Sequence, residues 1–393
     1  MIKRERYLEK IRPFYDSDLI KVITGIRRCG KSVILKQIKD EISKETDNII
    51  FLELESVRLQ KLIPDVDALL KYVDENKKEG KCYIFLDEIQ ILNGWQDACK
   101  TLRLEDNSVF ITGSNSKLLS SEFTKELSGR YVSFRVRPFV YRELLAYAKE
   151  LKKEISISDY LIYGGFPKAL EFDGESKLDY LYDLNQTIIY NDIMERYTIK
   201  NRELFKNISD FVLRANSRIL STRSITNYVN SNNQSASINT VINYVSYLEE
   251  AFAINKIKPY STKTKQELAY KFKVYDEDVS FNSIRCFDGK FDLDHNLENV
   301  VYNELIYMGY DVSVLNSNEK EIDFRAKKDN KIYLIQVAYS VVDEKAYERE
   351  FAPFNQIDNS CQKILITTDD VDFSTSTVRH IKLKDFLLME EIG

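Results

Sequence analysis

The chain has 393 residues, 44% hydrophobic and 30% charged, which is ordinary globular composition and enough for about two or three domains. With only 12 Gly and 6 Pro it is neither collagenous nor a low-complexity or linker-rich chain. The formal net charge of −5 excludes a general attraction to nucleic acid or anionic lipid, so any polyanion site must be a local patch.

Rare residue types and apolar runs limit what the chain can build. The five cysteines lack metal-ligand spacing and form no C-x-x-C pair, which predicts a reducing compartment without a disulfide framework. Two histidines are too few for a His-rich zinc site. Residues 1–18 carry no apolar signal-peptide region, and no apolar run reaches the ~20 residues that span a bilayer. We therefore expect a cytoplasmic protein with no membrane partner.

The first third of the chain alternates predicted strands and helices. The unbroken apolar run at 82–86 is typical of a central parallel strand that is covered on both faces. The alternation predicts an α/β domain over residues 1–140, with a doubly wound parallel sheet and ligands at the carboxyl ends of its strands. Strands are expected at 19–24, 48–54, 82–86, 108–112 and 131–136, and helices at 31–42, 66–77 and 96–102.

Beyond about residue 138 the pattern changes. Residues 141–215 are mostly helical in pattern, with a turn at 164–167, and are predicted to form a helical connector. Helix, turn, helix and β-ribbon over residues 216–280 are the outline of a winged helix. Residues 281–393 are predicted to form an α+β domain, with a helix at 297–310 and strands at 311–315, 321–326, 331–338 and 362–367.

A phosphate-binding motif stands between the first strand and the first helix of the sheet domain. The segment GIRRCGKS fits G-x-x-x-x-G-K-[ST] at every fixed position. Glycines let the backbone N–H groups converge on phosphate oxygens, and the following helix directs its positive end there. Lys31 is expected to reach the β- and γ-phosphates, and the Ser32 hydroxyl to ligate Mg²⁺. The predicted nucleotide-binding residues are Gly25, Ile26, Arg27, Arg28, Cys29, Gly30, Lys31, Ser32 and Val33.

Hydrolysis of ATP needs a metal partner and a base. Asp87 ends the apolar strand, where its carboxylate can hold the Mg²⁺ shell beside Ser32, and Glu88 follows as the candidate general base. Two acidic residues in an ordinary strand-end turn are the alternative interpretation. Ser114 and Asn115, after the next strand, are suited to contact the γ-phosphate or orient the water, and they are also ordinary helix N-caps.

The arginines near this site have more than one interpretation. Arg27 and Arg28 lie inside the loop, where they contact phosphate or a neighbouring acidic group. Arg130 precedes the fifth strand, on what we expect to be the catalytic edge of the sheet. It acts there as an arginine finger in its own chain or in a neighbouring copy, or it forms a structural salt bridge. A finger donated by a neighbour requires a homo-oligomer, so the oligomeric state stays open.

Several segments carry a likeness to a known family. They are GIRRCGKS at 25–32, LDEIQ at 86–90 with Trp95, TGSNS at 112–116, SGRY at 128–131, YGGFP at 163–167 and DIMERY at 192–197. In this order they resemble the bacterial and archaeal AAA+-superfamily ATPases that carry a C-terminal domain of unknown function. The resemblance implies an ASCE/AAA+-type parallel sheet, ATP binding and hydrolysis, a winged-helix middle and a C-terminal fold related to restriction endonucleases. It implies no biological task.

The winged-helix segment invites a DNA-binding interpretation, which its charges support only in part. Residues 237–251, the expected recognition helix, contain no Lys or Arg, whereas DNA readers place cations near phosphates. Sequence-independent phosphate contact through the ribbon is one interpretation, and a protein-docking module or a lid over the ATPase site is the alternative. The ribbon lysines are Lys256, Lys258, Lys263, Lys265, Lys271 and Lys273.

The C-terminal segment has a candidate metal site. Glu304 on a helix, Asp323 on a strand and Gln336 on the next strand follow the order of ligands in the restriction-endonuclease-like nucleases. These nucleases also use a lysine two residues beyond the last ligand, and here that position is Ala338. Lys327, Lys328 or Lys331 replaces it only if the fold places one of them there. Residues 281–393 are therefore predicted to be a degenerate PD-(D/E)XK nuclease-like domain. An active nuclease, and unrelated charges on a surface sheet, are the alternatives.

Three functions are compatible with these sites. The leading hypothesis is an Mg²⁺-dependent ATPase whose nucleotide state repositions the winged-helix and nuclease-like modules. The second is a nucleic-acid-processing nuclease that ATP hydrolysis licenses. The third is a protein-binding module that ATP stabilises. The expected partners are accordingly ATP, DNA through the ribbon, and a protein partner or a second copy of the chain.

Overall fold

The computed structural model describes residues 2–114, 127, 129–232, 234–257, 259–260, 271–286, 289–317, 320–356 and 361–393. These residues divide into two compact units. The first comprises residues 1–138 with 250–252, and the second comprises residues 139–249 with 253–393. The predicted boundary at residue 140 lies within two residues of this division. The finer division of the later residues into three domains stays a prediction.

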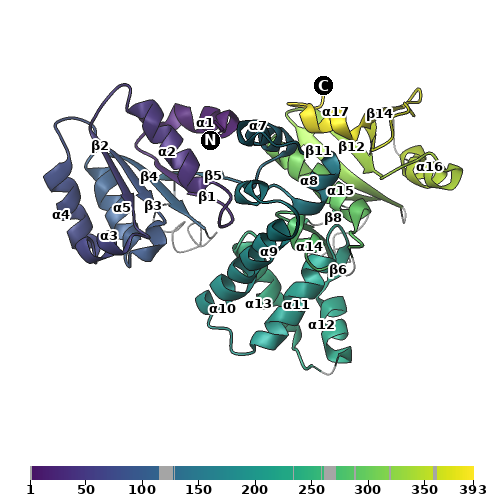
Figure 1. The fold of residues 1–393 in the computed structure, drawn as a ribbon, viewed down its shortest axis with the longest axis horizontal. Coiled ribbons are helices and arrows are strands. Elements are labelled where there is room, and N and C mark those ends of the chain that lie inside the picture. The colour runs from purple at the N-terminus through teal and green to yellow at the C-terminus, as the bar shows by residue number, and fades with distance from the viewer. Residues whose placement is uncertain are drawn as a thin grey trace. The chain divides into compact units, whose positions relative to one another are not determined.

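The first unit is built on one parallel sheet with helices between its strands (Figure 1). Its strands are β1 (Ile20–Thr24), β2 (Ile49–Glu53), β3 (Tyr83–Asp87), β4 (Ser108–Gly113) and β5 (Tyr131–Arg135). Its described helices of more than one turn are α1 (Glu5–Ile11), α2 (Lys31–Ile42), α3 (Val57–Leu62), α4 (Val66–Asn76) and α5 (Trp95–Leu104). All five predicted strands are present.

The strand order in this sheet is β2-β3-β4-β1-β5, and every described pairing is parallel. The predicted doubly wound parallel sheet is thus confirmed. Parallel strands end at the same edge of a sheet, so the residues that follow β1, β3 and β4 come together at its carboxyl edge. The loop after β1, the carboxylates after β3 and the polar residues after β4 are therefore neighbours.

Both faces of the sheet are buried, which explains the unbroken apolar run of β3. Ile84 and Leu86 of this strand belong to the core cluster that α4 and α5 complete with Leu69, Val73 and Leu102. On the other face Phe85 stacks on Phe110, with ring centroids 4.6 Å apart. The helix α2 packs against β1, β3 and β4. Burial of alternate side chains on opposite faces holds these strands in one register.

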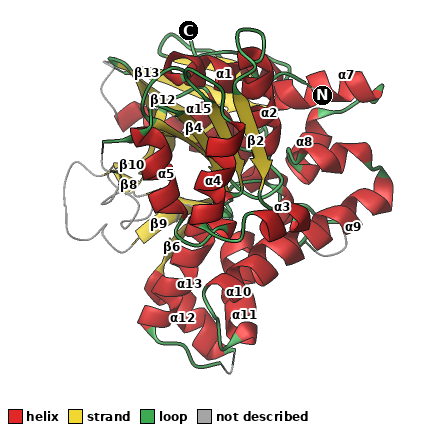
Figure 2. Ribbon diagram, turned by 90° about the vertical axis from the view of Figure 1, so that its left-hand side faces the viewer, coloured by secondary structure: helices red, strands yellow, loops and turns green. Residues whose placement is uncertain are grey.

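The second unit begins with helices. Figure 2 shows helices α10 to α13 gathered at one end of this unit, beside β6 and β9. Within the described part of the chain, no helix is both long and apolar enough to cross a membrane. The helices are α7 (Tyr141–Leu151), α8 (Ile157–Tyr163), α9 (Gly174–Asn185), a π-helical turn (Gln186–Asp192), α10 (Ile193–Arg196), α11 (Arg202–Arg214), α12 (Thr222–Ser231), α13 (Ile238–Glu250), α14 (Ser280–Ser283), α15 (Leu293–Tyr307), α16 (Glu344–Phe351) and α17 (Leu383–Leu388).

Two sheets complete the second unit. The smaller sheet is antiparallel, in the order β6-β9-β7. In the sequence, β6 follows α11, and α12 and α13 come between β6 and β7. The larger one is mixed, in the order β14-β13-β12-β11-β10-β8. The predicted α/β character of the whole chain is confirmed, whereas the winged-helix and nuclease-like assignments stay predictions. The strands are β6 (Ile219–Ser221), β7 (Ile254–Ile257), β8 (Pro259–Tyr260), β9 (Lys271–Asp276), β10 (Asp311–Ser317), β11 (Lys320–Lys328), β12 (Lys331–Val337), β13 (Gln362–Thr367) and β14 (Val378–Lys382).

Candidate functional site

The predicted phosphate loop lies between β1 and α2, as its sequence requires. Gly25 and Gly30 have positive φ angles of 147° and 102°, and Arg28 also adopts a left-handed conformation. A Cβ atom on Gly25 would lie 2.1 Å from the carbonyl oxygen of Val136, so no other residue fits there without displacing the backbone. The loop curls into the amino end of α2, a 12-residue helix whose dipole favours bound anions.

Lys31 is held inside this loop. Only 4% of its side chain is exposed. Its Nζ atom donates to the carbonyl oxygen of Ile26 at 3.2 Å and lies 3.6 Å from Oε1 of Glu88. The ammonium group that is expected to contact phosphate therefore lies next to the carboxylate that is expected to act as a base. An incoming phosphate would exchange these partners of Lys31 for its own oxygens.

Asp87 lies at the centre of a hydrogen-bond cluster at the carboxyl edge of the sheet. The Ser32 hydroxyl donates to its Oδ1 atom at 3.1 Å, and the Thr112 hydroxyl donates to the same oxygen. Burial raises the pKa of Asp87, against the opposing effect of the hydrogen bonds from Thr112 and Ser32. The structure thus brings Ser32 and Asp87 together, and adds Thr112, which was not among the predicted site residues.

Glu88 is held in an uncommon conformation. Its φ angle is +55°, in the left-handed region that non-glycine residues rarely adopt. Its backbone N–H donates to the Thr112 hydroxyl at 2.9 Å, and Gln90 donates to its carboxylate. Of its side chain, 14% is exposed. Backbone strain of this kind gathers at functional sites, where surrounding contacts fix it.

The other predicted catalytic residues, Asn115 and Arg130, and the neighbouring Ser114 differ in where they lie. Ser114 is half-buried just after β4, at the edge that carries the loop, whereas Asn115 lies outside the described residues. The expected position of Arg130 is wrong. Its carbonyl oxygen accepts from the N–H of Ile20, at the start of β1, so it lies at the amino edge of the sheet. A parallel strand carries its preceding residue at the edge opposite the phosphate loop, and this position argues against a finger role in the same chain.

Arginines surround the loop in three different ways. Arg27 pairs with Glu55 at 3.6 Å, and Arg28 is exposed. Arg4 is only 1% exposed, and its guanidinium donates to the carbonyl oxygen of Cys29 at 3.0 Å and lies over the ring of Tyr7. Arg4 belongs to a charged terminal segment typical of a solvated surface, and its burial is not indicated by the residues around it.

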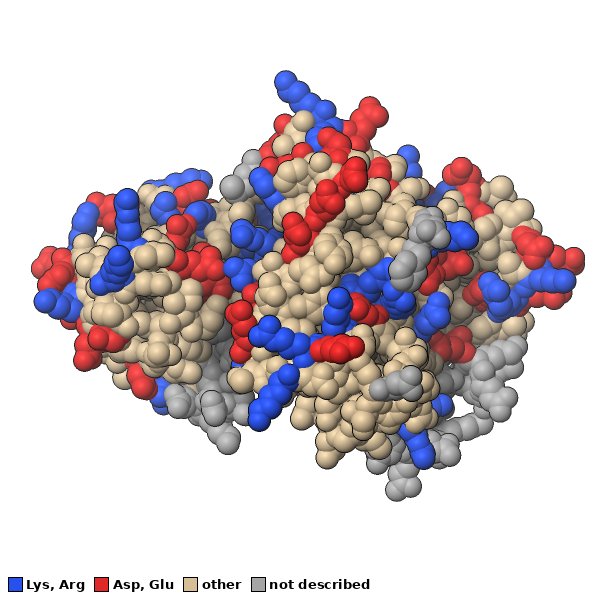
Figure 3. Space-filling model, turned by 60° about the horizontal axis from the view of Figure 1, so that its bottom comes forward, with Lys and Arg blue, Asp and Glu red and all other residues tan. Residues whose placement is uncertain are grey.

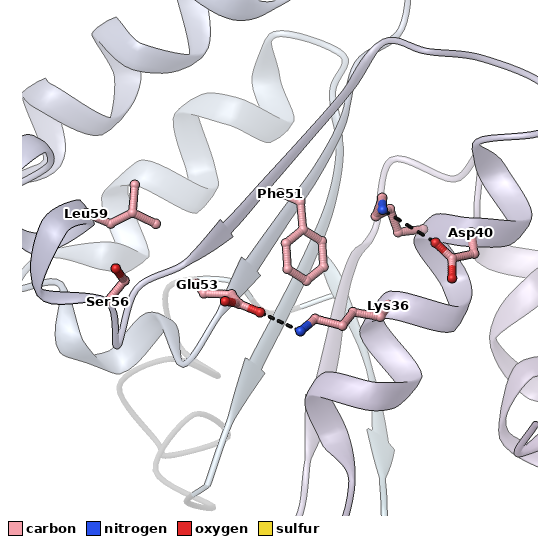
Figure 4. A pocket seen from close by; sticks show the side chains of 7 residues that line it. Lys36, Asp40, Phe51, Glu53, Ser56 and Leu59 are labelled. Carbon is pink, nitrogen blue, oxygen red and sulfur yellow. Dashed lines mark hydrogen bonds and ion pairs between the residues drawn. The ribbon is translucent and has the colours of Figure 1, made fainter. Parts of the chain in front are cut away.

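A separate cavity of ≈480 Å³ opens beside α2 and the edge strand β2 (Figure 4). The Lys36 Nζ atom lies 2.6 Å from Oε1 of Glu53 there, and this ion pair spans the cavity. No residue of 25–32 lines it, so it is not the phosphate site. The lining residues are Lys36, Lys39, Asp40, Phe51, Glu53, Ser56 and Leu59.

The candidate metal site in the second unit is only partly assembled. Asp323 and Gln336 are neighbours, since the Asp323 N–H donates to Gln336 Oε1 at 3.4 Å. Glu304 is fully buried, and its Oε1 atom accepts from the N–H of Tyr141 at 3.1 Å, at the amino end of α7. Its predicted role beside Asp323 stays a prediction. Glu298, six residues earlier on α15, is linked to Asp323 through Lys273.

The ribbon offers DNA fewer cations than the sequence indicates. Lys273 is buried, so its predicted contact with phosphate is wrong. Lys256 pairs with Glu249 at 2.5 Å, and Lys271 is exposed. The lysines at 258, 263 and 265 lie outside the described residues. On the face drawn in Figure 3, Lys and Arg side chains are interspersed with Asp and Glu side chains.

Two family models match the chain. One, described as an AAA domain, matches residues 17–145, and the other, described as a domain of unknown function (DUF8612), matches residues 154–284. An uncharacterized protein of Haemophilus influenzae is 34% identical over 378 residues, which cover 93% of each chain. An uncharacterized protein of Methanocaldococcus jannaschii is 30% identical over 385 residues, which cover 91% of this chain and 84% of that protein.

A solved structure shares the fold. The Walker-type ATPase of Pyrococcus abyssi superposes with a TM-score of 0.50 at 15% sequence identity, over 72% of this chain and 96% of that chain. At such identity the likeness shows the fold alone.

Proposed function

The chain belongs to the AAA+ P-loop ATPases and shares a family with its two uncharacterized relatives from Haemophilus and Methanocaldococcus. From this premise we propose that it binds and hydrolyses ATP at Gly25–Ser32. One observation carries the proposal: Lys31 and Ser32 of α2 meet Asp87 and Glu88 of the β3 end through direct side-chain contacts. These groups are the ones that phosphoryl transfer needs at one point.

The donor set fits Mg²⁺. Ser32 Oγ and Asp87 Oδ1 are 3.1 Å apart, and both are hard oxygen ligands of the kind that Mg²⁺ takes together with water and phosphate. We expect Ser32 and Asp87 to hold the ion with the nucleotide. When bound, Mg²⁺ supplies neutralisation of the charge that develops on the phosphate oxygens.

The residues of the chain divide the remaining work. The loop amides and Lys31 hold the phosphates, and contact with phosphate separates Lys31 from Glu88. Glu88, so released, accepts a proton from the attacking water as general base. Thr112 fixes both carboxylate residues through its hydroxyl group, which donates to Asp87 and accepts from the N–H of Glu88.

The proposal is tested by two substitutions with opposite effects. Lys31→Ala is expected to lose ATP binding in calorimetry, because the loop then lacks its ammonium group. Glu88→Gln is expected to keep ATP binding while turnover falls about 100-fold or more, the usual contribution of a general base. Lys36→Ala, on the outer side of the same helix, is the matched control and leaves both unchanged. Equal ATP affinity in Lys31→Ala and the wild type would refute the site.

Nucleotide state is proposed to act on the second unit through the segment after β5. Val136 lies against the phosphate loop, where its carbonyl oxygen accepts from the Cys29 thiol at 3.3 Å and closes over Gly25. Residues 136–138 lead directly into the second unit. A change in the loop on loss of the γ-phosphate therefore moves the chain that enters that unit. Hydrogen exchange of residues 136–145 with ATP and with ADP measures this, and identical exchange would contradict it.

The second unit is proposed to bind a protein in preference to DNA. The helix α13 carries no Lys or Arg, and exposes Ile238 and Ile242 by 52% and 48%. Apolar exposure without cations suits a protein surface and not a phosphate backbone. Fluorescence anisotropy with single- and double-stranded DNA at low salt is expected to show no tight binding. Salt-sensitive binding in the nanomolar range would favour the DNA alternative.

A further inference from the structure

A buried lysine lies among carboxylates in the second unit. The Nζ atom of Lys273 is 2.7 Å from Glu298 Oε1, 2.6 Å from Glu321 Oε1 and 3.5 Å from Asp323 Oδ1. Only 4% of the Lys273 side chain is exposed. The lysine comes from β9 of the small sheet, whereas its partners come from α15 and from β11 of the large sheet. Opposite charges from three elements therefore meet at one point.

The carboxylates are also held by groups other than the lysine. The Tyr275 hydroxyl donates to Glu298 Oε1 at 2.6 Å. The N–H of Val337 donates to Asp323 Oδ2 at 2.9 Å. Gln336, which follows Asp323 in the nuclease-like order, donates its amide to Glu350 at 2.8 Å. The oxygens around Lys273 thus belong to a built centre, fixed by backbone and side-chain donors.

We propose that Lys273 is the resident cation of this centre and takes the place of the divalent metal that a restriction-endonuclease-like fold would hold there. An ammonium group has three donors, which match the three carboxylates in contact with it. Among the described residues, no group of His, Cys, Asp and Glu is arranged to hold a metal ion. An ammonium cannot activate water as a bound metal does, so the centre joins the two sheets and cuts no nucleic acid.

Removal of the Lys273 ammonium group is expected to turn this centre into a site for a divalent metal. Without Lys273, buried carboxylates of like charge face one another with no counter-ion, which destabilises the fold. A divalent cation has the charge and the ligand preference to take the vacated position. We therefore expect a divalent metal to stabilise the Lys273→Met variant but not the wild type. This inference does not depend on the ATPase activity of the first unit.

The test compares melting temperatures of the full chain with and without millimolar MnCl₂, in the absence of nucleotide. We expect Lys273→Met to melt lower than the wild type, and Mn²⁺ at about ten times its Kd to raise the melting temperature by about 3 °C or more. The wild type shows no comparable rise. Lys328→Met is the matched control, because Lys328 pairs with Glu391 at 2.8 Å in a more exposed position. An equal Mn²⁺ response in all three proteins would overturn the proposal.

A second pair of variants decides the matter if Lys273→Met does not fold without metal. Glu298→Gln removes one negative charge and keeps the shape of the side chain. The proposal predicts that the protein with both Lys273→Met and Glu298→Gln folds better than the protein with Lys273→Met alone, because fewer carboxylates then lack a counter-ion. If the double variant folds no better, Lys273 acts through packing alone, and the proposal fails.

Discussion

Lys21 provides a stability prediction that can be worked through from the structure. It lies on β1 at the sheet edge opposite the phosphate loop, and it is fully buried. Its Nζ atom donates to the Ser17 carbonyl at 3.1 Å and to the Ser108 hydroxyl at 2.8 Å. Within the described part of the chain, no carboxylate forms an ion pair with it. Burial lowers the pKa of Lys21 from 10.5 to about 7, because the charged form loses its hydration.

The sign of the pH effect follows from proton binding. Between pH 7 and 10.5 the unfolded chain keeps a proton on Lys21 that the folded chain has released. Stability of the first unit therefore rises with pH in this window. Linkage with these two pKa values gives a gain of about 2 kcal/mol between pH 7 and pH 9. Below pH 7 both states are protonated, and the cost of the buried charge is constant.

The assay is urea unfolding at pH 7, 8 and 9, followed by Trp95 fluorescence. Trp95 is the single tryptophan, and it lies in the core of the first unit, so its signal reports that unit. Lys21→Met removes the titrating group, and we expect its stability to exceed that of the wild type at pH 7 and to approach it at pH 9. Lys36→Met controls for loss of an exposed lysine. A difference between wild type and Lys21→Met that stays constant with pH would refute the reasoning.

Four further predictions concern function. Gly25→Ala is expected to abolish ATP binding while Trp95 unfolding stays cooperative, because the added Cβ meets the Val136 carbonyl; calorimetry measures it, and retained affinity would contradict the loop geometry. Thr112→Val should lower turnover about tenfold or more at unchanged ATP affinity, since hydrogen bonds to both carboxylate residues are lost, and Thr112→Ser should restore it. Arg130→Ala should leave turnover of the monomer unchanged, and a loss confined to oligomers would assign it to a neighbouring chain. The wild type should not nick DNA or RNA with Mg²⁺ or Mn²⁺, and cleavage lost in Asp323→Ala would restore the nuclease alternative.

The phosphate loop could be predicted because its geometry is local. Glycines at fixed spacing, a strand before them and a helix after them determine the conformation of residues 25–32. Asp87 could also be predicted, since a carboxylate at the end of a buried parallel strand lies at the edge that carries the loop. Thr112 follows from the same rule, as β4 lies between β1 and β3, but only once the strand order is known.

The same rule places Arg130 at the opposite edge of the sheet from the phosphate loop. A residue that precedes a parallel strand lies at the amino edge, and β5 pairs with β1 from Ile20 and Tyr131 onward. Its position in the sequence, directly before a strand, already excludes the carboxyl edge. The position of Arg4 could not be predicted for another reason. Its burial depends on α1 packing against α2, and no local pattern indicates that packing.

The centre formed by Lys273 and its three carboxylates could not be identified from the sequence, because its cation comes from another sheet. Lys273 and Glu321 are 48 positions apart, and spacing rules compare only residues within one element or its neighbours. On the sequence Lys273 is one of several ribbon lysines, and Glu298 and Glu304 are equivalent candidates on one helix. The pairing of Lys273 with Glu298, Glu321 and Asp323 removes a cation from the DNA-binding surface and a metal from the nuclease-like centre together. One tertiary contact thus weakens both nucleic-acid alternatives, and it favours the proposed ATP hydrolysis over them as the chemistry of this chain.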